Sequence, residues 1–300
     1  IVRSEPMDRN IRAIKEAAFQ RGVDLAVYFA RKANKCMTFV DAAFRAGAGI
    51  DVASDQELKQ ALERGVPGEK VICTAAIKPV ALVERCIAQG VTLVIDNLCE
   101  LRRILHIAES RQLTARAAIR LSGFKHDGQK LHSRFGFDVD EVDDLLSRVA
   151  DLDATRRLLI EGLHFHLDGY CARERVSAIA QCIALVDAFR QQRHHIAYLD
   201  MGGGFPMRYL HNETQWNSFW HAHQAALLGV RPPLTYQNHG LGLQVVDDQV
   251  VGNRDVYPYY QAAIGPQWLG QILDSPCDGA QTSAKHLIRS NLELRCEPGR

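Results

Sequence analysis

A lysine and a pair of histidines are the side chains of this sequence best suited to covalent and acid–base chemistry. Lys32 lies two residues beyond the end of the apolar run 25–30. Because burial disfavours an ammonium group, a lysine in such a place can have a lowered pKa and form a Schiff base with a carbonyl compound. His164 and His166 end the apolar run 158–166 two residues apart, so they point to the same side of a strand. They could bind a metal ion or stack on a ring, although the sequence offers no third metal ligand. Taken alone, a surface lysine and two core histidines are the ordinary explanation of these residues.

Two further segments offer groups for an anion and for a ring nitrogen. The glycine run 202–204 follows the apolar run 196–201, and consecutive glycines let backbone N–H groups converge on an anion such as phosphate. The run lacks the spacing of a dinucleotide fingerprint and the lysine of a P-loop. Glu297 and Arg300 follow the last apolar run. An arginine can bind phosphate through two hydrogen bonds, and a buried carboxylate can pair with a protonated ring nitrogen.

Short apolar runs and helical stretches alternate along most of the sequence, as in a parallel sheet covered by helices. Helices are expected over 8–22, 40–47, 54–64, 79–89, 98–110 and 173–193. Strands are expected over 25–30, 49–52, 71–73, 91–95, 115–121, 158–166, 196–201 and 292–296. Eight such strands in 300 residues favour an α/β fold of the (β/α)8 TIM-like barrel type, with an open doubly wound sheet as the alternative. A barrel would bring the segments described above together, because the C-terminal ends of its strands share one face.

The stretch 229–283 interrupts this alternation. It is rich in proline and contains a hairpin-like segment, 243–251, with Asp247 and Asp248 at its turn. Insertions of this size in a compact domain are usually lids or interface elements. The sequence therefore predicts one barrel domain over 1–300, with an insertion at about 229–283 between the seventh and eighth strands.

In this order, the segments resemble the fold type III pyridoxal phosphate (PLP)-dependent decarboxylases. That group includes the ornithine, diaminopimelate and arginine decarboxylases, and its barrel is similar to that of alanine racemase. The resemblance covers about residues 8–210 and 285–300. Six motifs carry it, namely Lys32 after the first strand, Gly49-Ile50-Asp51-Val52-Ala53-Ser54 with Glu57, Ser133-Arg134-Phe135-Gly136-Phe137, His164-Phe165-His166, Gly202-Gly203-Gly204-Phe205-Pro206 and Glu297-Pro298-Gly299-Arg300.

The resemblance implies PLP as the cofactor and the decarboxylation of a diaminopimelate-like or ornithine-like amino acid as the reaction. It implies that Lys32 forms the Schiff base, that His166 stacks on the pyridine ring, and that Glu297 keeps the ring nitrogen protonated. These three are the implied catalytic residues, and no metal is implied. The other implied cofactor-binding residues are the phosphate cradle of Gly202, Gly203, Gly204, Gly299 and Arg300, with Asp51 and Arg120 as supporting residues.

The sequence departs from the family pattern in places. Where diaminopimelate decarboxylases usually read Ile-Gly-Ser-Gln after the stacking histidine, this chain reads Leu167-Asp168-Gly169-Tyr170. Gly169 thus replaces a serine that contacts the phosphate, and Tyr170 is a candidate substitute. The family also continues into a β-rich C-terminal domain, absent here, with a catalytic cysteine and a tyrosine at the interface of a homodimer with shared active sites. None of the eight cysteines of this chain can be given that role.

Composition excludes several classes of protein. The sequence has 36 basic and 35 acidic residues, so its net charge of +1 argues against nucleic acid as the main partner. It lacks an apolar run of the ~20 residues that a membrane span needs, and it shows no signal peptide. Eight cysteines without a C-x-x-C pair favour a cytoplasmic location. Because the sequence begins with Ile1 rather than Met, it is compatible with being a fragment.

Three alternative functions stay open. The first is an amino-acid racemase on the same barrel, although the residues after Asn34 differ from the Tyr-Gly-His extension typical of alanine racemases. The second is a non-catalytic, PLP-binding decarboxylase homologue, which the Gly169 departure and the insertion favour. The third is a metal-dependent barrel hydrolase that uses His164 and His166.

Overall fold

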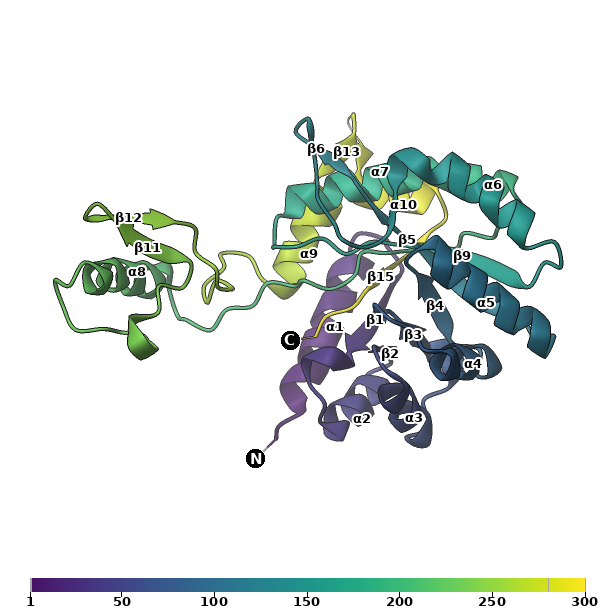
Figure 1. Cartoon of the computed structure of the whole chain (residues 1–300), viewed down its shortest axis with the longest axis horizontal. Helices are drawn as coiled ribbons and strands as arrows, with labels where there is room; N and C mark the ends of the chain where they lie inside the picture. The colour runs from purple at the N-terminus through teal and green to yellow at the C-terminus, as the bar shows by residue number, and fades with distance from the viewer. Residues whose placement is uncertain (1, 280, 300) are drawn as a thin grey trace. The chain divides into compact units, whose positions relative to one another are not determined.

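The computed structural model describes residues 2–279 and 281–299. In this part of the chain, eight parallel strands close into a barrel (Figure 1). The first strand pairs with the second and the last, and the fourth pairs with the fifth, so the sheet closes on itself. This confirms the expected barrel and excludes the open doubly wound sheet. The barrel strands are β1 (Leu25–Ala30), β2 (Gly49–Val52), β3 (Val71–Cys73), β4 (Thr92–Ile95), β5 (Ala115–Ser122), β9 (Leu158–His164), β10 (Tyr198–Asp200) and β15 (Glu293–Cys296).

Helices connect the strands and surround the barrel (Figure 1). They are α1 (Glu5–Phe19), α2 (Met37–Arg45), α3 (Asp55–Glu63), α4 (Val80–Ala88), α5 (Leu98–Arg111), α6 (Val142–Leu152), α7 (Ala172–Gln191), α9 (Gly265–Asp274) and α10 (Ser283–Arg289). At the N-terminus of α3, within the helix expected over 54–64, the Ser54 side chain accepts a hydrogen bond from the Glu57 backbone N–H. Asn97 caps α5 in the same way. Local capping chemistry thus defines where these helices begin.

Short elements decorate the connections. They are the 3₁₀ turns η1 (Arg31–Ala33), η2 (Gly68–Lys70) and η3 (Val139–Glu141), the paired strands β6 (Lys125–His126) and β7 (Gln129–Lys130), β8 (Phe137–Asp138), which adds to β5, and the paired strands β13 (Pro276–Asp278) and β14 (Gln281–Thr282). Helix α6 was not expected from the sequence, although its buried residues Val142, Leu145, Leu146 and Val149 do have helical spacing.

The barrel interior contains two large aromatic rings that glycines make room for. Tyr28 of β1 and Tyr198 of β10 belong to a buried cluster inside the barrel. A Cβ atom on Gly49 would lie 2.5 Å from the Tyr28 ring, and one on Gly162 would lie 2.1 Å from the Tyr198 ring. The Arg295 guanidinium lies 3.4 Å from the Tyr198 ring centroid. The interior is therefore a packed core rather than a pore.

Residues 206–264 form a compact unit of their own. This unit contains α8 (Glu213–Leu227), η4 (Tyr236–Asn238) and the antiparallel pair β11 (Leu243–Val246) and β12 (Gln249–Gly252). Its aromatic residues pack on one another, with the Trp216 and Trp220 rings edge to face at 5.4 Å. The hairpin expected over 243–251 is therefore present.

The boundaries of this unit differ from the expected insertion at 229–283. The unit begins earlier because α8 places its tryptophans in the unit's own aromatic core. It ends earlier because α9 packs against α1 and α7 of the barrel. Arg21, which follows α1, pairs with Asp274 at the end of α9 at 2.6 Å. Residues 265–283 therefore belong to the barrel unit, apart from residue 280, which lies outside the described residues.

In the part of the chain that the structure describes, we find no helix that is both long and apolar enough to cross a membrane.

Candidate active site

A cavity of about 310 Å³ opens at the C-terminal ends of the barrel strands. It is lined by side chains that lie in or follow six different strands, which explains why residues far apart in the sequence meet there. The polar lining residues are Lys32 after β1, Thr74 after β3, Arg120 in β5, His164 and His166 at and after the end of β9, and Glu297 after β15.

Lys32 lies beside a buried carboxylate in this cavity. Its Nζ atom is 3.1 Å from Asp51 Oδ2 and donates a hydrogen bond of 3.3 Å to Thr74 Oγ1. Thr74 donates in turn to Asp51 Oδ1 at 2.5 Å. The Asp51 side chain is fully buried, whereas the Lys32 side chain is partly exposed. The lysine is therefore held at one end and accessible from the cavity.

The charges of Lys32 and Asp51 depend on each other. Burial raises the pKa of Asp51 to about 7, with a further contribution from Glu297, while Lys32 lowers it. Burial lowers the pKa of Lys32, but the carboxylates of Asp51 and Glu297 raise it by more, so the net shift is upward. The lowered lysine pKa considered from the sequence is therefore not found, because two acidic neighbours outweigh desolvation.

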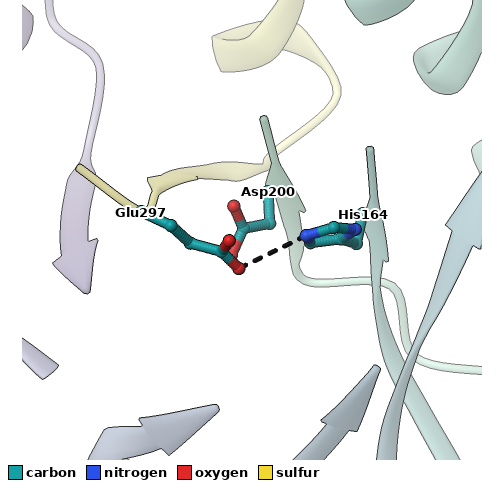
Figure 2. Close-up of side chains that lie close together, drawn as sticks. All are labelled: His164, Asp200 and Glu297. Carbon is teal, nitrogen blue, oxygen red and sulfur yellow. Dashed lines mark ion pairs between the residues drawn. The ribbon is translucent and has the colours of Figure 1, made fainter. Parts of the chain in front are cut away.

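Three buried side chains from adjacent strands lie close together, and two of them, His164 and Glu297, line the cavity (Figure 2). His164 ends β9, Asp200 ends β10 and Glu297 follows β15. His164 Nε2 lies 3.3 Å from Glu297 Oε1, and both side chains are almost completely buried. Asp200 Oδ1 accepts a hydrogen bond of 2.9 Å from the Gly202 N–H. Both ring nitrogens of His164, Asp200 Oδ2 and Glu297 Oε1 have no hydrogen-bond partner.

Burial controls the protonation of this group. It lowers the pKa of His164 to about 4, so the imidazole is neutral at pH 7. It raises the pKa of Asp200 to about 7, to which the Glu297 charge adds, and it also raises the pKa of Glu297. Two carboxylates in one dry site disfavour being charged together, so the site has a strong affinity for a proton or another cationic group.

This group also bears on the metal alternative. His164, Asp200 and Glu297 each present a potential ligand atom, and these atoms lie within 4.8 Å of one another. Among the residues that the structure describes, His166 is not part of such a group. The metal-dependent hydrolase requires both histidines as ligands, but only His164 belongs to the group of potential ligands described here.

The glycine run after β10 forms a tight turn at the rim of the site. Gly202 and Gly204 have φ angles of +66° and +79°, in the left-handed region that glycine adopts most readily. A Cβ atom on Gly203 would lie 2.8 Å from the Glu297 carbonyl oxygen. The Gly203 N–H donates to His166 Nδ1 at 3.2 Å. Because side chains would collide here, only glycine lets the backbone of this turn lie so close to its neighbours.

His166, Gly299 and Arg300 complete the expected set. Burial lowers the pKa of His166 to about 3, with further lowering by His164 and Lys32, so this ring is neutral. A Cβ atom on Gly299 would lie 2.5 Å from the Ala33 Cβ, so Gly299 allows the last strand to approach the segment that carries Lys32. Arg300 lies outside the described residues.

Arg120 reaches the cavity from β5. Its guanidinium lies 3.6 Å from Asp96 and 4.8 Å from the centroid of the Phe135 ring, which also lines the cavity. Burial lowers the pKa of Arg120, although nearby carboxylates oppose this effect. Apart from Arg300, the expected site residues thus surround this cavity or support its walls.

Two residues of the site had no role in the expectations drawn from sequence. Thr74 connects Lys32 to Asp51, and Asp200 faces Glu297. Both directly end or follow a predicted strand, so the rule that chemistry lies at the C-terminal ends of barrel strands could have found them.

Comparisons with known proteins show the family and the fold of this chain. The family model described as "Pyridoxal-dependent decarboxylase, pyridoxal binding domain" matches residues 7–229. The uncharacterized protein y4yA of Sinorhizobium fredii is 29% identical over 300 residues, which are 100% of this chain and 60% of that protein. The diaminopimelate decarboxylase of Halalkalibacterium halodurans is 29% identical over 217 residues, which are 67% of this chain and 48% of that enzyme.

Solved structures share the fold. The diaminopimelate decarboxylase of M. jannaschii, solved in complex with L-lysine, aligns with a TM-score of 0.67 and 18% identity over 99% of this chain and 59% of that one. The chain therefore spans about half to three fifths of the length of these relatives. The match to y4yA extends through residues 206–264, so that unit is included in a similarity that covers the whole chain.

Proposed function

This chain belongs to the pyridoxal-dependent decarboxylase family, whose cofactor is PLP, and from that premise we propose that it decarboxylates an amino acid. The observation that carries the proposal is that Lys32, His166 and Glu297 line one cavity of about 310 Å³. We propose a diaminopimelate-like or ornithine-like substrate. The support is the similarity to one diaminopimelate decarboxylase in sequence and to another, complexed with L-lysine, in fold.

The residues around the cavity fit this cofactor. Glu297 Oε1 is a buried acceptor without a hydrogen-bond partner, so it could accept a hydrogen bond from a cationic ring nitrogen. The glycine turn 202–204 lies beside Glu297 and His166, and its lack of side chains would let a phosphate approach the backbone. PLP, when bound, supplies an electron-accepting ring that stabilises the negative charge left on the substrate after carbon dioxide departs.

We propose that Glu297 holds the pyridine nitrogen of the cofactor. Burial raises the pKa of this carboxyl group, which means that the site favours a proton or a cation beside it. The neutral His164 ring, 3.3 Å away, can orient the carboxylate without adding a competing charge. A carboxylate in this position keeps the ring nitrogen protonated and so strengthens the ring as an electron acceptor.

We propose that Lys32 attaches covalently to the cofactor aldehyde and is displaced by the substrate amine. A lysine must lose a proton before it attacks a carbonyl group. Asp51, at 3.1 Å and with a pKa of about 7, is placed to accept that proton, and Thr74 orients both groups. His166, whose Nδ1 is held by the Gly203 N–H, is the residue proposed to cover one face of the ring.

We propose further that Arg120, Gly299 and Arg300 support the cofactor and that the protein is a cytoplasmic homodimer with shared active sites. No disulfide joins the cysteines that the structure describes, which fits a reducing compartment. The support for the dimer is the resemblance of the sequence motifs to the dimeric decarboxylases.

The test is an absorbance spectrum of the full-length protein with PLP, followed by borohydride reduction and peptide mass mapping. We expect a visible absorbance band and a pyridoxyl group on Lys32. The variant K32R should lose both. The matched control K35R changes a lysine of the same segment whose ammonium pairs with Glu57, and it should keep both. A folded protein without band or adduct would refute the proposal.

Product analysis separates decarboxylation from the alternatives. Release of carbon dioxide from diaminopimelate, ornithine, lysine or arginine supports the proposed reaction. Interconversion of enantiomers without carbon dioxide would indicate a racemase. Binding of PLP without turnover in the full-length protein would indicate a non-catalytic homologue, and bound zinc in place of PLP would indicate the metal-dependent hydrolase.

A further inference from the structure

Arg175 is a buried cation that meets no carboxylate. It lies in the first turn of α7 and is 0% exposed. Its guanidinium donates only to backbone carbonyl oxygens, and no ion pair among the described residues includes it. The acceptors belong to the loop that follows β9, and they are Leu167 at 3.2 Å, Gly169 at 2.9 Å and Cys171 at 3.2 Å. The guanidinium also lies 4.9 Å from the centroid of the Trp268 ring.

This cation costs free energy in the absence of an anion. Burial lowers the pKa of Arg175 to about 10, so the group is still charged at neutral pH. Nearby Glu174 and Asp168 raise that pKa only in part, and neither forms an ion pair with it. A buried charge without a counterion is unfavourable, and its Nε atom has no hydrogen-bond partner at all. An anion bound close by would offset this cost.

The nearest candidate anion site is the glycine turn after β10. A Cβ atom on Gly204 would lie 2.7 Å from Arg175 Nη2, so the guanidinium packs directly against this glycine. The same guanidinium nitrogen donates to Leu167 and Gly169. Arg175 therefore joins two loops, one after β9 and one after β10, and places a positive charge at their junction.

We propose that Arg175 is a positioning residue for a phosphate group bound at the glycine turn 202–204, acting through its charge and through its hold on the loop 167–171. This inference rests on the proposed function, because PLP would supply the phosphate. It adds a residue that belongs to none of the six family-like motifs of the sequence. A fixed guanidinium beside this turn favours a dianionic phosphate over a neutral group.

The experiment compares ligands with and without phosphate on the full-length protein. Dissociation constants for PLP and for pyridoxal are measured by absorbance titration on the wild type, R175Q and R175K. We expect R175Q to weaken PLP binding at least about tenfold while changing pyridoxal binding much less, because a glutamine donates hydrogen bonds without charge. R175K should keep most of the preference for PLP. R190Q is the matched control, because Arg190 lies in the same helix and also donates to backbone carbonyl oxygens, of Ile196 and Ser290.

Equal weakening of PLP and pyridoxal would overturn the inference, because it would show that Arg175 only holds the loop. If R175Q does not fold, R175K decides alone. A lysine keeps the charge but cannot reach three carbonyl groups, so a retained preference supports the inference and an equal loss refutes it. Stabilisation by inorganic phosphate, read as a thermal shift, separates this inference from the proposed function. Phosphate binding that depends on Arg175 in a protein that does not bind PLP would refute only the proposed function. A protein that binds neither phosphate nor PLP would refute both this inference and the proposed function.

Discussion

Replacing the buried Asp200 by asparagine should stabilise the cofactor-free protein at alkaline pH. The Asp200 side chain is completely buried, and its pKa is raised from 3.8 to about 7 by burial and then by the charge of Glu297. An asparagine has the same shape and can still accept the hydrogen bond that the Gly202 N–H donates at 2.9 Å. The substitution therefore removes a charge and retains a contact.

The direction follows from proton linkage. A carboxyl group whose pKa is raised on folding binds more protons in the native state than in the unfolded state, so stability falls as pH rises from about 4 to about 7. The full shift of about three pKa units corresponds to about 4 kcal/mol, since one unit is worth about 1.36 kcal/mol. The free energy of unfolding of D200N should therefore exceed that of the wild type by about 4 kcal/mol at pH 8. At pH 5 the excess should be only about 2 kcal/mol, because protonation of Asp200 in the folded wild type relieves part of the penalty.

The assay is chemical denaturation of the cofactor-free protein at several pH values between 5 and 8. The difference between variant and wild type is the quantity to follow, because His164 and His166 also titrate abnormally and bias the pH dependence of each protein in the opposite sense. Their folded-state pKa values are lowered, so their contribution increases stability as pH rises through the range in which the unfolded imidazoles titrate. D168N, at an exposed aspartate of the neighbouring loop, is the control and should show no such pH-dependent difference.

A D200N protein that is less stable than the wild type by the same amount at every pH would refute this reasoning. That result would mean that the charge of Asp200 is compensated in the folded state and that only its packing matters. A gain that grows with pH would show that the site stores an unfavourable charge for function, which is a common trade between stability and activity.

Two other substitutions test the structure around the cavity. G203A adds a Cβ atom 2.8 Å from the Glu297 carbonyl oxygen, so we expect at least about tenfold weaker PLP binding with the fold retained, measured by titration and circular dichroism. Unchanged affinity would show that this turn is not part of the cofactor site. In the wild type, Lys78 Nζ and Glu100 Oε1 form a buried ion pair at 2.8 Å. K78M removes the cation and leaves the Glu100 carboxylate buried without it, so this variant should lower the free energy of unfolding by about 3–5 kcal/mol. The double variant K78M/E100Q should recover much of that loss, because a glutamine can still accept the hydrogen bond that the Asp96 N–H donates to Glu100. A double variant as unstable as K78M would contradict this account.

Local signals in the sequence were sufficient to predict the barrel but not the bounds of the compact unit 206–264. The buried strands are short apolar runs that alternate with helical stretches, so the order of these elements could be predicted. The start of the second compact unit at residue 206 could not be predicted. The periodicity of α8 does not reveal whether its aromatic face packs on the barrel or within that unit.

The sequence by itself determined which side chains stand at the C-terminal ends of the strands, because the alternation of strand and helix is a local property of the chain. Lys32, Glu297 and the glycine run 202–204 could therefore be assigned to one face. Only the tertiary structure decided what these groups touch. Pairing of β1 with β2 brings Asp51 within 3.1 Å of Lys32, and the neighbouring strands β9, β10 and β15 bring Glu297 within 3.3 Å of His164, so distance and burial set their pKa values. Electrostatic neighbours come from packing between strands remote in sequence, which no local pattern encodes.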